Sequence, residues 1–200
     1  ASETPVTDGE RVYAYFGNVG VFCYDVAGTP LWSRPMTPHA TRLGWGTAAS
    51  PVLHEGKLFI VCDNEEESYL ATYDAASGNP LWRVTRDERS NWATPFVWSN
   101  GLRTELVVPA TGKVRSYDPD DGRVLWEFGG MSKTTIPTPT AAHDMLYVSS
   151  GYVGDKVRPI FAVRPGASGD ITLRKDQETN EFVSWRLPQA GPYHPVVGDY

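Results

Sequence analysis

The stretch Asp74-Ala75-Ala76-Ser77-Gly78-Asn79-Pro80-Leu81-Trp82 decides the fold of this chain. Its spacing, Asp-x-x-x-Gly-x-x-x-Trp, returns at Asp118–Trp126, and Asp25–Trp32 is one residue shorter. An aspartate can accept hydrogen bonds from backbone amides in a turn, and glycine supplies the positive φ that a tight turn needs. The tryptophan has a large apolar face to bury against a neighbour. We therefore interpret the stretch as a turn and strand that dock one structural unit onto the next.

The docking stretch belongs to a longer repeat. The prolines that open successive units are 46, 44, 44 and 56 residues apart, at Pro5, Pro51, Pro95, Pro139 and Pro195. Within each unit, short runs rich in Val, Tyr, Phe and Leu are separated by turn signals, which is typical of antiparallel strands and hairpins. A period of roughly 40 to 50 residues indicates stacked supersecondary units, and a propeller blade contains four strands in about that length.

The sequence thus predicts an all-β chain of four-stranded antiparallel blades, about four blades of a larger β-propeller ring. The predicted blades are 1–45, 46–90, 91–134 and 135–190, with 191–200 as the first strand of a further blade. The residues predicted to dock the blades are Asp25, Gly28, Trp32, Asp74, Gly78, Trp82, Asp118, Gly122, Trp126 and Trp185.

The fourth unit departs from the pattern. Arg164 stands where aspartate is expected, and residues 166–180 intervene before Trp185. The docking turn of this unit is therefore an open question. We expect the extra length to form a loop between the third and fourth strands.

These repeats resemble the tryptophan-docking repeat of PQQ-like (pyrroloquinoline quinone, quinoprotein-dehydrogenase-like) propellers, approximately A-x-D-x-x-x-G-x-x-x-W, over nearly the whole chain. That family includes quinoprotein alcohol dehydrogenases, the propeller lipoprotein of the bacterial outer-membrane barrel-assembly machinery, and repeat proteins of unassigned role. The resemblance implies a ring of seven or eight blades. It also implies a periplasmic or otherwise extracytoplasmic location, with peripheral or lipoprotein association open for the parent protein.

Composition excludes several classes of function. The net charge of −6 provides no basic face for nucleic acid. No run approaches the roughly 18 apolar residues of a membrane-spanning helix. Cys23 and Cys62 lie on separate predicted strands without metal-ligand spacing, so we interpret them as unlinked core thiols, with a disulfide left open. No metal site is predicted.

Cofactor chemistry finds little support in the residues. The resemblance implies that a PQQ dehydrogenase would carry an adjacent cysteine pair, a calcium site of Glu, Asn and Asp, and a catalytic aspartate, but no adjacent cysteines occur. We interpret Asn18, Asn64 and Asn91 as turn or loop residues, and the acidic run 63–67 as a solvated loop. The cluster Asp118–Gly122 lacks the spacing of an EF-hand calcium loop. No catalytic residue and no cofactor is predicted, with PQQ and calcium as the alternative.

Propeller sites gather where loops enter the innermost strands, at the mouth of the channel. Those loops supply aromatic and cationic groups that suit an acidic or extended polypeptide, although Trp45 and Trp92 could instead simply pack the blade tops. The favoured function is a non-catalytic scaffold that binds a protein or polymer partner at this face. The alternatives are a PQQ-dependent dehydrogenase whose cofactor site lies partly outside this stretch and an extracytoplasmic sensor domain. The candidate channel-face residues are Arg42, Trp45, Asn91, Trp92, Lys133, Tyr193 and His194.

Overall fold

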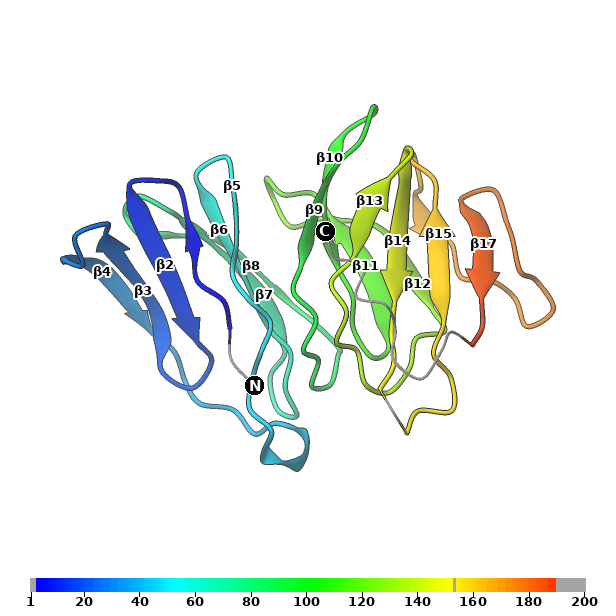
Figure 1. Ribbon diagram of the computed structural model, residues 1–200, viewed down its shortest axis with the longest axis horizontal. Coiled ribbons are helices and arrows are strands. Elements are labelled where there is room, and N and C mark those ends of the chain that lie inside the picture. The colour runs from blue at the N-terminus through cyan, green and yellow to red at the C-terminus, as the bar shows by residue number, and fades with distance from the viewer. Residues whose placement is uncertain (1–2, 153, 190–200) are drawn as a thin grey trace. The chain divides into compact units, whose positions relative to one another are not determined.

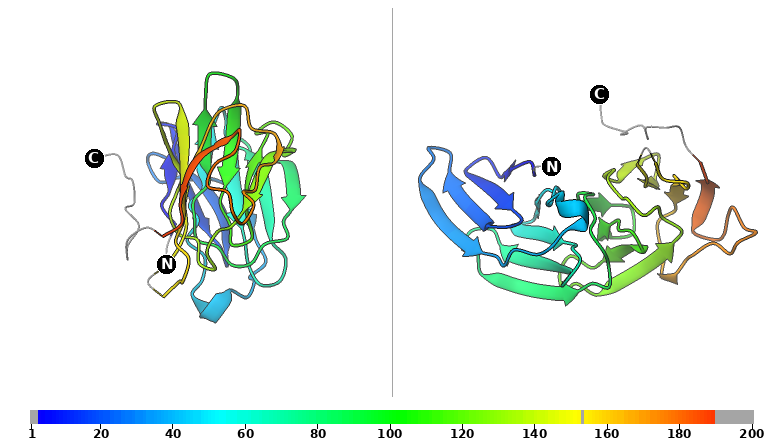
Figure 2. Two further views of the ribbon diagram at one scale, coloured as in Figure 1. Left: turned by 90° about the vertical axis from the view of Figure 1, so that its right-hand side faces the viewer. Right: turned by 90° about the horizontal axis from the view of Figure 1, so that it is seen from below.

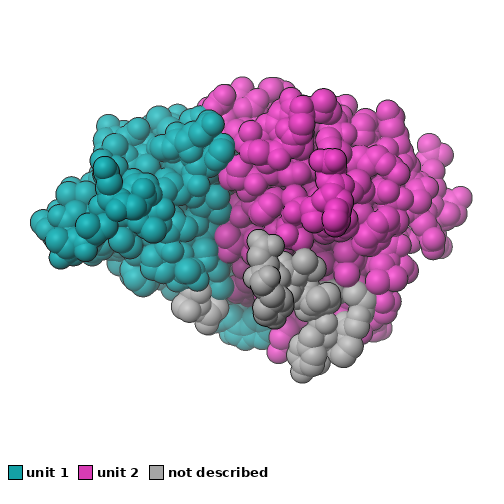
Figure 3. All heavy atoms as spheres, turned by 45° about the horizontal axis from the view of Figure 1, so that its top comes forward, with its two compact units in different colours: residues 1–90 teal, residues 91–200 magenta. Residues whose placement is uncertain are grey.

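Four antiparallel sheets make up the described part of the chain (Figure 1). The computed structural model describes residues 3–152 and 154–189, so the predicted strand at 191–200 and the candidates Tyr193 and His194 lie outside it. Two compact units divide the chain, Ala1–Ser90 and Asn91–Tyr200 (Figure 3), and each is described by itself.

Unit 1 contains two four-stranded sheets with the strands in sequence order. Hairpins join neighbouring strands because each pair is antiparallel. The first sheet is β1 (Val6–Thr7), β2 (Arg11–Phe16), β3 (Gly20–Asp25) and β4 (Pro30–Pro35), and the second is β5 (Val52–His54), β6 (Lys57–Cys62), β7 (Tyr69–Asp74) and β8 (Pro80–Thr85). A short 3-10 turn, η1 (Arg42–Gly44), lies between them.

Unit 2 repeats this plan with one addition. A two-residue strand, β16 (Gly169–Asp170), lies beside β12 and parallel to it, as a fifth strand of the third sheet. The third sheet is otherwise β9 (Phe96–Ser99), β10 (Thr104–Val108), β11 (Lys113–Tyr117) and β12 (Val124–Gly129), and the fourth is β13 (Thr140–Ala142), β14 (Met145–Ser149), β15 (Ile160–Val163) and β17 (Val183–Leu187).

The cores form where the inward side chains of adjacent sheets meet. Alternate residues of a strand point to the same face, so Tyr13 and Tyr15 of β2 lie together and pack with Leu58 and Ile60 of β6. In unit 2, Trp126 and Phe128 of β12 form a buried cluster with residues of the fourth sheet, including Phe161. Burial of these apolar faces is the main favourable contribution to folding.

A β-bulge marks the fourth strand of every sheet at one equivalent point, just after the connection that leads from the third strand. The strand register shifts at Cys23/Tyr24, Thr72/Tyr73, Ser116/Tyr117 and Ala162/Val163. Two residues of the fourth strand oppose one of the third at each point, and the extra residues are Leu31, Leu81, Leu125 and Ser184. A bulge bends its strand and increases the local twist. The fourth unit keeps this bulge although its aspartate is replaced by Arg164.

The predicted class of antiparallel four-stranded sheets is confirmed, and 3-10 turn η1 is the one helical element among the described residues. No helix in residues 3–152 and 154–189 has the length and apolar character to cross a membrane. Cys23 and Cys62 are free and buried, as the sequence predicts.

Candidate functional site

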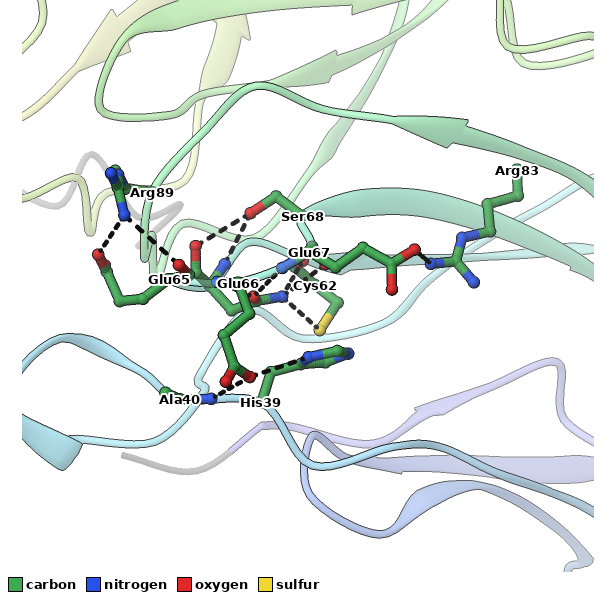
Figure 4. A network of polar contacts seen from close by, with 10 residues as sticks. His39, Ala40, Cys62, Glu65, Glu66, Glu67, Ser68, Arg83 and Arg89 are labelled. Atoms are coloured by element: carbon green, nitrogen blue, oxygen red, sulfur yellow. Dashed lines mark hydrogen bonds and ion pairs between the residues drawn. The ribbon is translucent and has the colours of Figure 1, made fainter.

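The loop between β6 and β7 is an ordered polar network (Figure 4). Asn64 organises it, since its Nδ2 donates to the carbonyl oxygens of Cys62 (3.1 Å) and Glu67 (2.8 Å). Its Oδ1 accepts from the backbone N–H groups of Glu66 (2.8 Å) and Glu67 (2.7 Å). Both ends of the Asn64 amide are therefore used within the loop, and this side chain is buried.

A buried ion pair closes the base of this acidic loop. Arg86 donates through Nε to Asp63 Oδ1 (2.8 Å) and through a terminal nitrogen to Oδ2 (3.0 Å), and both side chains are fully buried. The expectation of a solvated loop at 63–67 is therefore wrong for Asp63 and Asn64. The two parallel hydrogen bonds compensate for the loss of hydration when both charges are buried. The acidic sequence of residues 63–67 does not reveal this partner.

Glu65 and Glu66 each tie the acidic loop to another segment of unit 1. Glu65 Oε1 accepts from the hydroxyl (2.8 Å) and backbone N–H (3.1 Å) of Ser90, and the hydroxyl bond is the main cause that lowers the pKa of Glu65. Glu66 Oε2 accepts from the backbone N–H of Ala40 (2.9 Å) and lies 3.2 Å from His39 Nδ1. The Ala40 bond lowers the pKa of Glu66.

These contacts hold the loop 41–46, which enters the second sheet. The N–H of Glu65 donates to the carbonyl of Ala40 (2.9 Å), and the N–H of Arg42 donates to Ser90 Oγ (2.9 Å). Within the loop, Gly46 N–H donates to Thr41 Oγ1 (2.9 Å). The loop therefore has a defined shape. Its turn η1 projects beyond the strand ends of unit 1 in Figure 1 and in the left view of Figure 2.

The loop 41–46 presents an apolar tip to solvent. Leu43 is 74% exposed and Trp45 is 44% exposed. Leu43 has φ of 56°, in the left-handed region that leucine rarely occupies. Strained backbone of this kind persists only where surrounding contacts enforce it, and such positions cluster at functional sites.

The other candidate channel-face residues divide by burial. Asn91 is buried and structural in its contacts, because its Nδ2 donates to the carbonyl of Pro109 (2.8 Å) and its Oδ1 accepts from Ala93 N–H (2.9 Å). Trp92 is buried as well, and Lys133 is exposed. Arg42 and Trp45 share one loop, and Asn91 and Trp92 share another. A channel-face role for this set stays a prediction.

Two of the predicted docking residues of unit 1, Trp32 and Gly78, meet across its two sheets. The indole N–H of Trp32 donates to the carbonyl of Ala75 (3.0 Å), inside the docking turn of the next sheet. Gly78 lies directly under the indole, since a Cβ there would lie 2.6 Å from two ring atoms of Trp32. Sequence reasoning missed Arg34, which donates to the carbonyl of Gly78 (2.6 Å) and clasps the same turn.

The aspartate and glycine of the docking turns have the geometry of a capped turn. The Oδ1 atoms of Asp25, Asp74 and Asp118 accept from backbone N–H groups two to four residues ahead, at 2.8–3.0 Å. The corresponding glycines have positive φ, at Gly28 (87°), Gly78 (66°) and Gly122 (75°).

The tryptophans of unit 2 differ from Trp32. Trp126 is fully buried, its indole N–H donates to Glu105 Oε2 (2.5 Å), and its backbone pairs with Gly169 of β16. Trp185 is 42% exposed and packs beside Tyr147. Trp82 of unit 1 is half-buried beside Phe59. Docking by these side chains remains a prediction.

The residues present do not fit the PQQ and calcium site that the resemblance implies. Burial raises the pKa of the Cys23 and Cys62 thiols, which are separate rather than adjacent. The amides of Asn64 and Asn91 are used by their own loops, and Asn18 lies in an exposed turn. Within the described residues, no group of three or more His, Cys, Asp or Glu side chains is arranged to hold a metal ion.

Comparison with known proteins gives a family match. A family model described as outer membrane protein assembly factor BamB matches residues 17–192. No curated protein sequence matches the chain.

Solved structures share the fold at low identity. BamB from Moraxella catarrhalis is similar with a TM-score of 0.62 and 13% identity, over 93% of this chain and 48% of that one. Quinohemoprotein alcohol dehydrogenase ADHIIG from Pseudomonas putida HK5 has a TM-score of 0.65 and 15% identity, and the match covers 94% of this chain and 34% of that one. Quinohemoprotein alcohol dehydrogenase from Comamonas testosteroni has a TM-score of 0.65 and 14% identity, and the match covers 96% of this chain and 35% of that one. The chain spans half or less of these β-propeller proteins, and the likeness shows the fold alone.

Proposed function

Because the chain belongs to the PQQ-like β-propeller repeat family whose model is described as outer membrane protein assembly factor BamB, we propose that it is a non-catalytic scaffold that binds a polypeptide partner through the loop 41–46. The solved structures similar to this chain include both BamB and a quinohemoprotein alcohol dehydrogenase. The fold alone therefore does not distinguish partner binding from catalysis.

The observation that carries the proposal is the apolar tip of an otherwise polar, well-anchored loop. Leu43 and Trp45 remain exposed although six hydrogen bonds of backbone groups fix the segment Ala40–Gly46. Scattered apolar side chains on a surface need no explanation, but two on one strained turn indicate a built contact point. Pre-ordering lowers the entropy cost of binding.

The residue types also suit a protein interface. Tryptophan and arginine are enriched among the residues that contribute most of the binding energy, and the loop carries Arg42 and Trp45 three residues apart. A partner that buries Leu43 and Trp45 in an apolar pocket, with an acceptor group opposite Arg42, would match this arrangement. An extracytoplasmic location accompanies the proposal, by analogy with the described function of the family.

The quinoprotein-dehydrogenase alternative rests on the fold likeness to two quinohemoprotein alcohol dehydrogenases. It is disfavoured by the two separate thiols and by the committed amides of Asn64 and Asn91.

An interaction experiment tests the scaffold. The immobilised chain is incubated with an envelope extract of its source organism, and bound proteins are quantified by mass spectrometry. We expect a polypeptide to be retained by the native chain and lost by the double variant Leu43→Ser with Trp45→Ala. The control is Leu102→Ser, because Leu102 is equally exposed but lies in unit 2. Retention of every bound protein by the double variant would refute the loop as a binding site.

A further inference from the structure

Two loops of unit 2 are joined into one surface. These are residues 130–139, which lead into β13, and residues 150–158, which connect β14 to β15. Ser132 N–H donates to Ser150 Oγ (2.8 Å), and Gly151 N–H donates to the carbonyl of Thr134 (3.0 Å). These two bonds hold the loops side by side.

This surface is cationic on a chain of net charge −6. Lys133 follows Ser132, Lys156 follows Asp155, and both lysines are exposed. The carboxylate of Asp155 is turned back into the loops, where Oδ2 accepts from the N–H of Tyr152 (3.0 Å) and Oδ1 lies 3.5 Å from the hydroxyl of Thr134. With Arg158, the two loops carry three cations against one carboxylate.

The same two loops also expose apolar side chains. Ile136, Tyr152 and Val157 are 42%, 50% and 49% exposed. Three such side chains on two joined loops exceed the isolated exposure that is normal on protein surfaces. Interfaces commonly combine exposed aromatic and aliphatic groups with charges at their rim.

We propose that Lys133, Ile136, Tyr152, Lys156 and Val157 form a second interaction surface, which binds an acidic polypeptide segment that carries apolar side chains. This inference deepens the proposed function, since it assumes a polypeptide partner and states the chemistry of a second contact with it. Glutamate or aspartate of the segment pairs with the lysines, and its apolar side chains cover Tyr152 and its two aliphatic neighbours.

Charge number favours a peptide over an anionic membrane. Lipid-binding clusters usually present about 4 to 8 basic residues, because each contributes about 1 kcal/mol near the bilayer. The loops 130–139 and 150–158 present three, and the chain as a whole is acidic. A short acidic segment needs only local complementarity of charge.

Fluorescence anisotropy tests the proposal on the whole chain. The probe is a fluorescein-labelled peptide of repeated Glu-Phe-Glu-Gly, and its counterpart carries glutamine in place of glutamate. We expect saturable binding of the acidic probe only, weakened about tenfold by Lys133→Glu combined with Lys156→Glu, since both substitutions turn attraction at the rim into repulsion. The matched control is Lys175→Glu, an exposed lysine of the β15–β17 connection, which should leave binding unchanged.

Three results would overturn this second surface: no binding of the acidic probe, equal binding of the glutamine peptide, or equal affinity for the double lysine variant. Binding to phosphatidylglycerol vesicles without binding to the peptide would also overturn it, in favour of a membrane contact. The variant Leu43→Ser with Trp45→Ala separates the two proposals, because it should leave the acidic probe bound even if the loop 41–46 has no partner.

Discussion

The absence of a side chain at Gly78 allows Trp32 of the first sheet to pack closely against the second sheet. The indole of Trp32 lies where a Cβ of residue 78 would be, whereas a Cβ at Gly28, in the equivalent turn of the first sheet, would have no neighbour within 4 Å. Both glycines have positive φ, so both are strained by a side chain. The pair separates the cost of backbone strain from the cost of a clash.

We expect Gly28→Ala to lower the free energy of unfolding by about 1–2 kcal/mol, the cost of the left-handed conformation. Gly78→Ala should cost about 1–3 kcal/mol more, because the indole must move. Urea denaturation followed by circular dichroism measures both. Equal losses would show that Trp32 does not depend on close approach to the turn.

Trp126 provides a second test at the same scale. It is fully buried, and Trp126→Ala should lower the free energy of unfolding by about 3–5 kcal/mol through the cavity it leaves. Trp185→Ala removes a partly exposed ring and its contact with Tyr147. Apart from the loss of that contact, we expect this variant to lower the free energy of unfolding by about 1 kcal/mol or less. A loss below about 1 kcal/mol for Trp126→Ala would contradict a docking role.

Sequence reasoning identified the turn residues but not their partners. Aspartate, glycine and tryptophan stand out because their chemistry is local and recurs at a fixed spacing. Arg34 and Glu105 do not recur, and their hydrogen bonds join residues far apart or on other strands. The left-handed Leu43 carries no sequence signal at all, since leucine is a poor residue for that conformation.

Among the elements, the acidic loop 63–67 has contacts that depend on charge. The pKa of Glu66 is lowered by the Ala40 N–H and that of Glu65 by the Ser90 hydroxyl. A depressed pKa stabilises the folded state at pH above the ordinary value of 4.5, and this contribution is lost as pH falls through the lowered value.

We therefore expect the amide NMR signals of Ala40 and Ser90 to titrate with midpoints below the ordinary glutamate value of 4.5. Glu66→Gln should abolish the titration of Ala40 and leave that of Ser90. Midpoints at or above the ordinary value would show that these carboxylates do not hold the loop 41–46 in solution.

β16 is a strand that the sequence did not predict. The stretch 166–180 was expected to be a loop, and no apolar alternation marks a strand of two residues. Its position depends on distant atoms: Ile171 N–H donates to the carbonyl of Glu127 (2.9 Å), and Gly129 N–H donates to Thr172 Oγ1 (3.0 Å). The strands with alternating apolar residues were predictable because that pattern is local.

Ile171 tests the attachment of this segment. It is buried, and Ile171→Ala should cost about 2–5 kcal/mol. Leu102→Ala, at an exposed position of the same unit, should change the free energy of unfolding by no more than about 0.5 kcal/mol. Similar values for the two variants would mean that β16 contributes nothing to the third sheet.

On the scale of the whole molecule, the chain shares its fold with quinohemoprotein alcohol dehydrogenases, but its residues do not fit a site for PQQ and calcium. Adding PQQ with calcium to the chain should leave the quinone absorbance unchanged, and no alcohol-dependent dye reduction should follow. Saturable binding with turnover would replace the scaffold proposal with an enzyme.

The parallel pairing of β16 with β12 bears on the order of biosynthesis. A ribosome or a secretion channel delivers the chain from its N-terminus, and domains commonly fold as they emerge. The third sheet lacks its last strand until residues 169–172 have emerged, some 40 residues after β12 is complete. A pause or truncation between these points would leave the edge of β12 unpaired, where it could pair with another strand or bind a chaperone. The third sheet is therefore complete only when part of the fourth repeat has been synthesised.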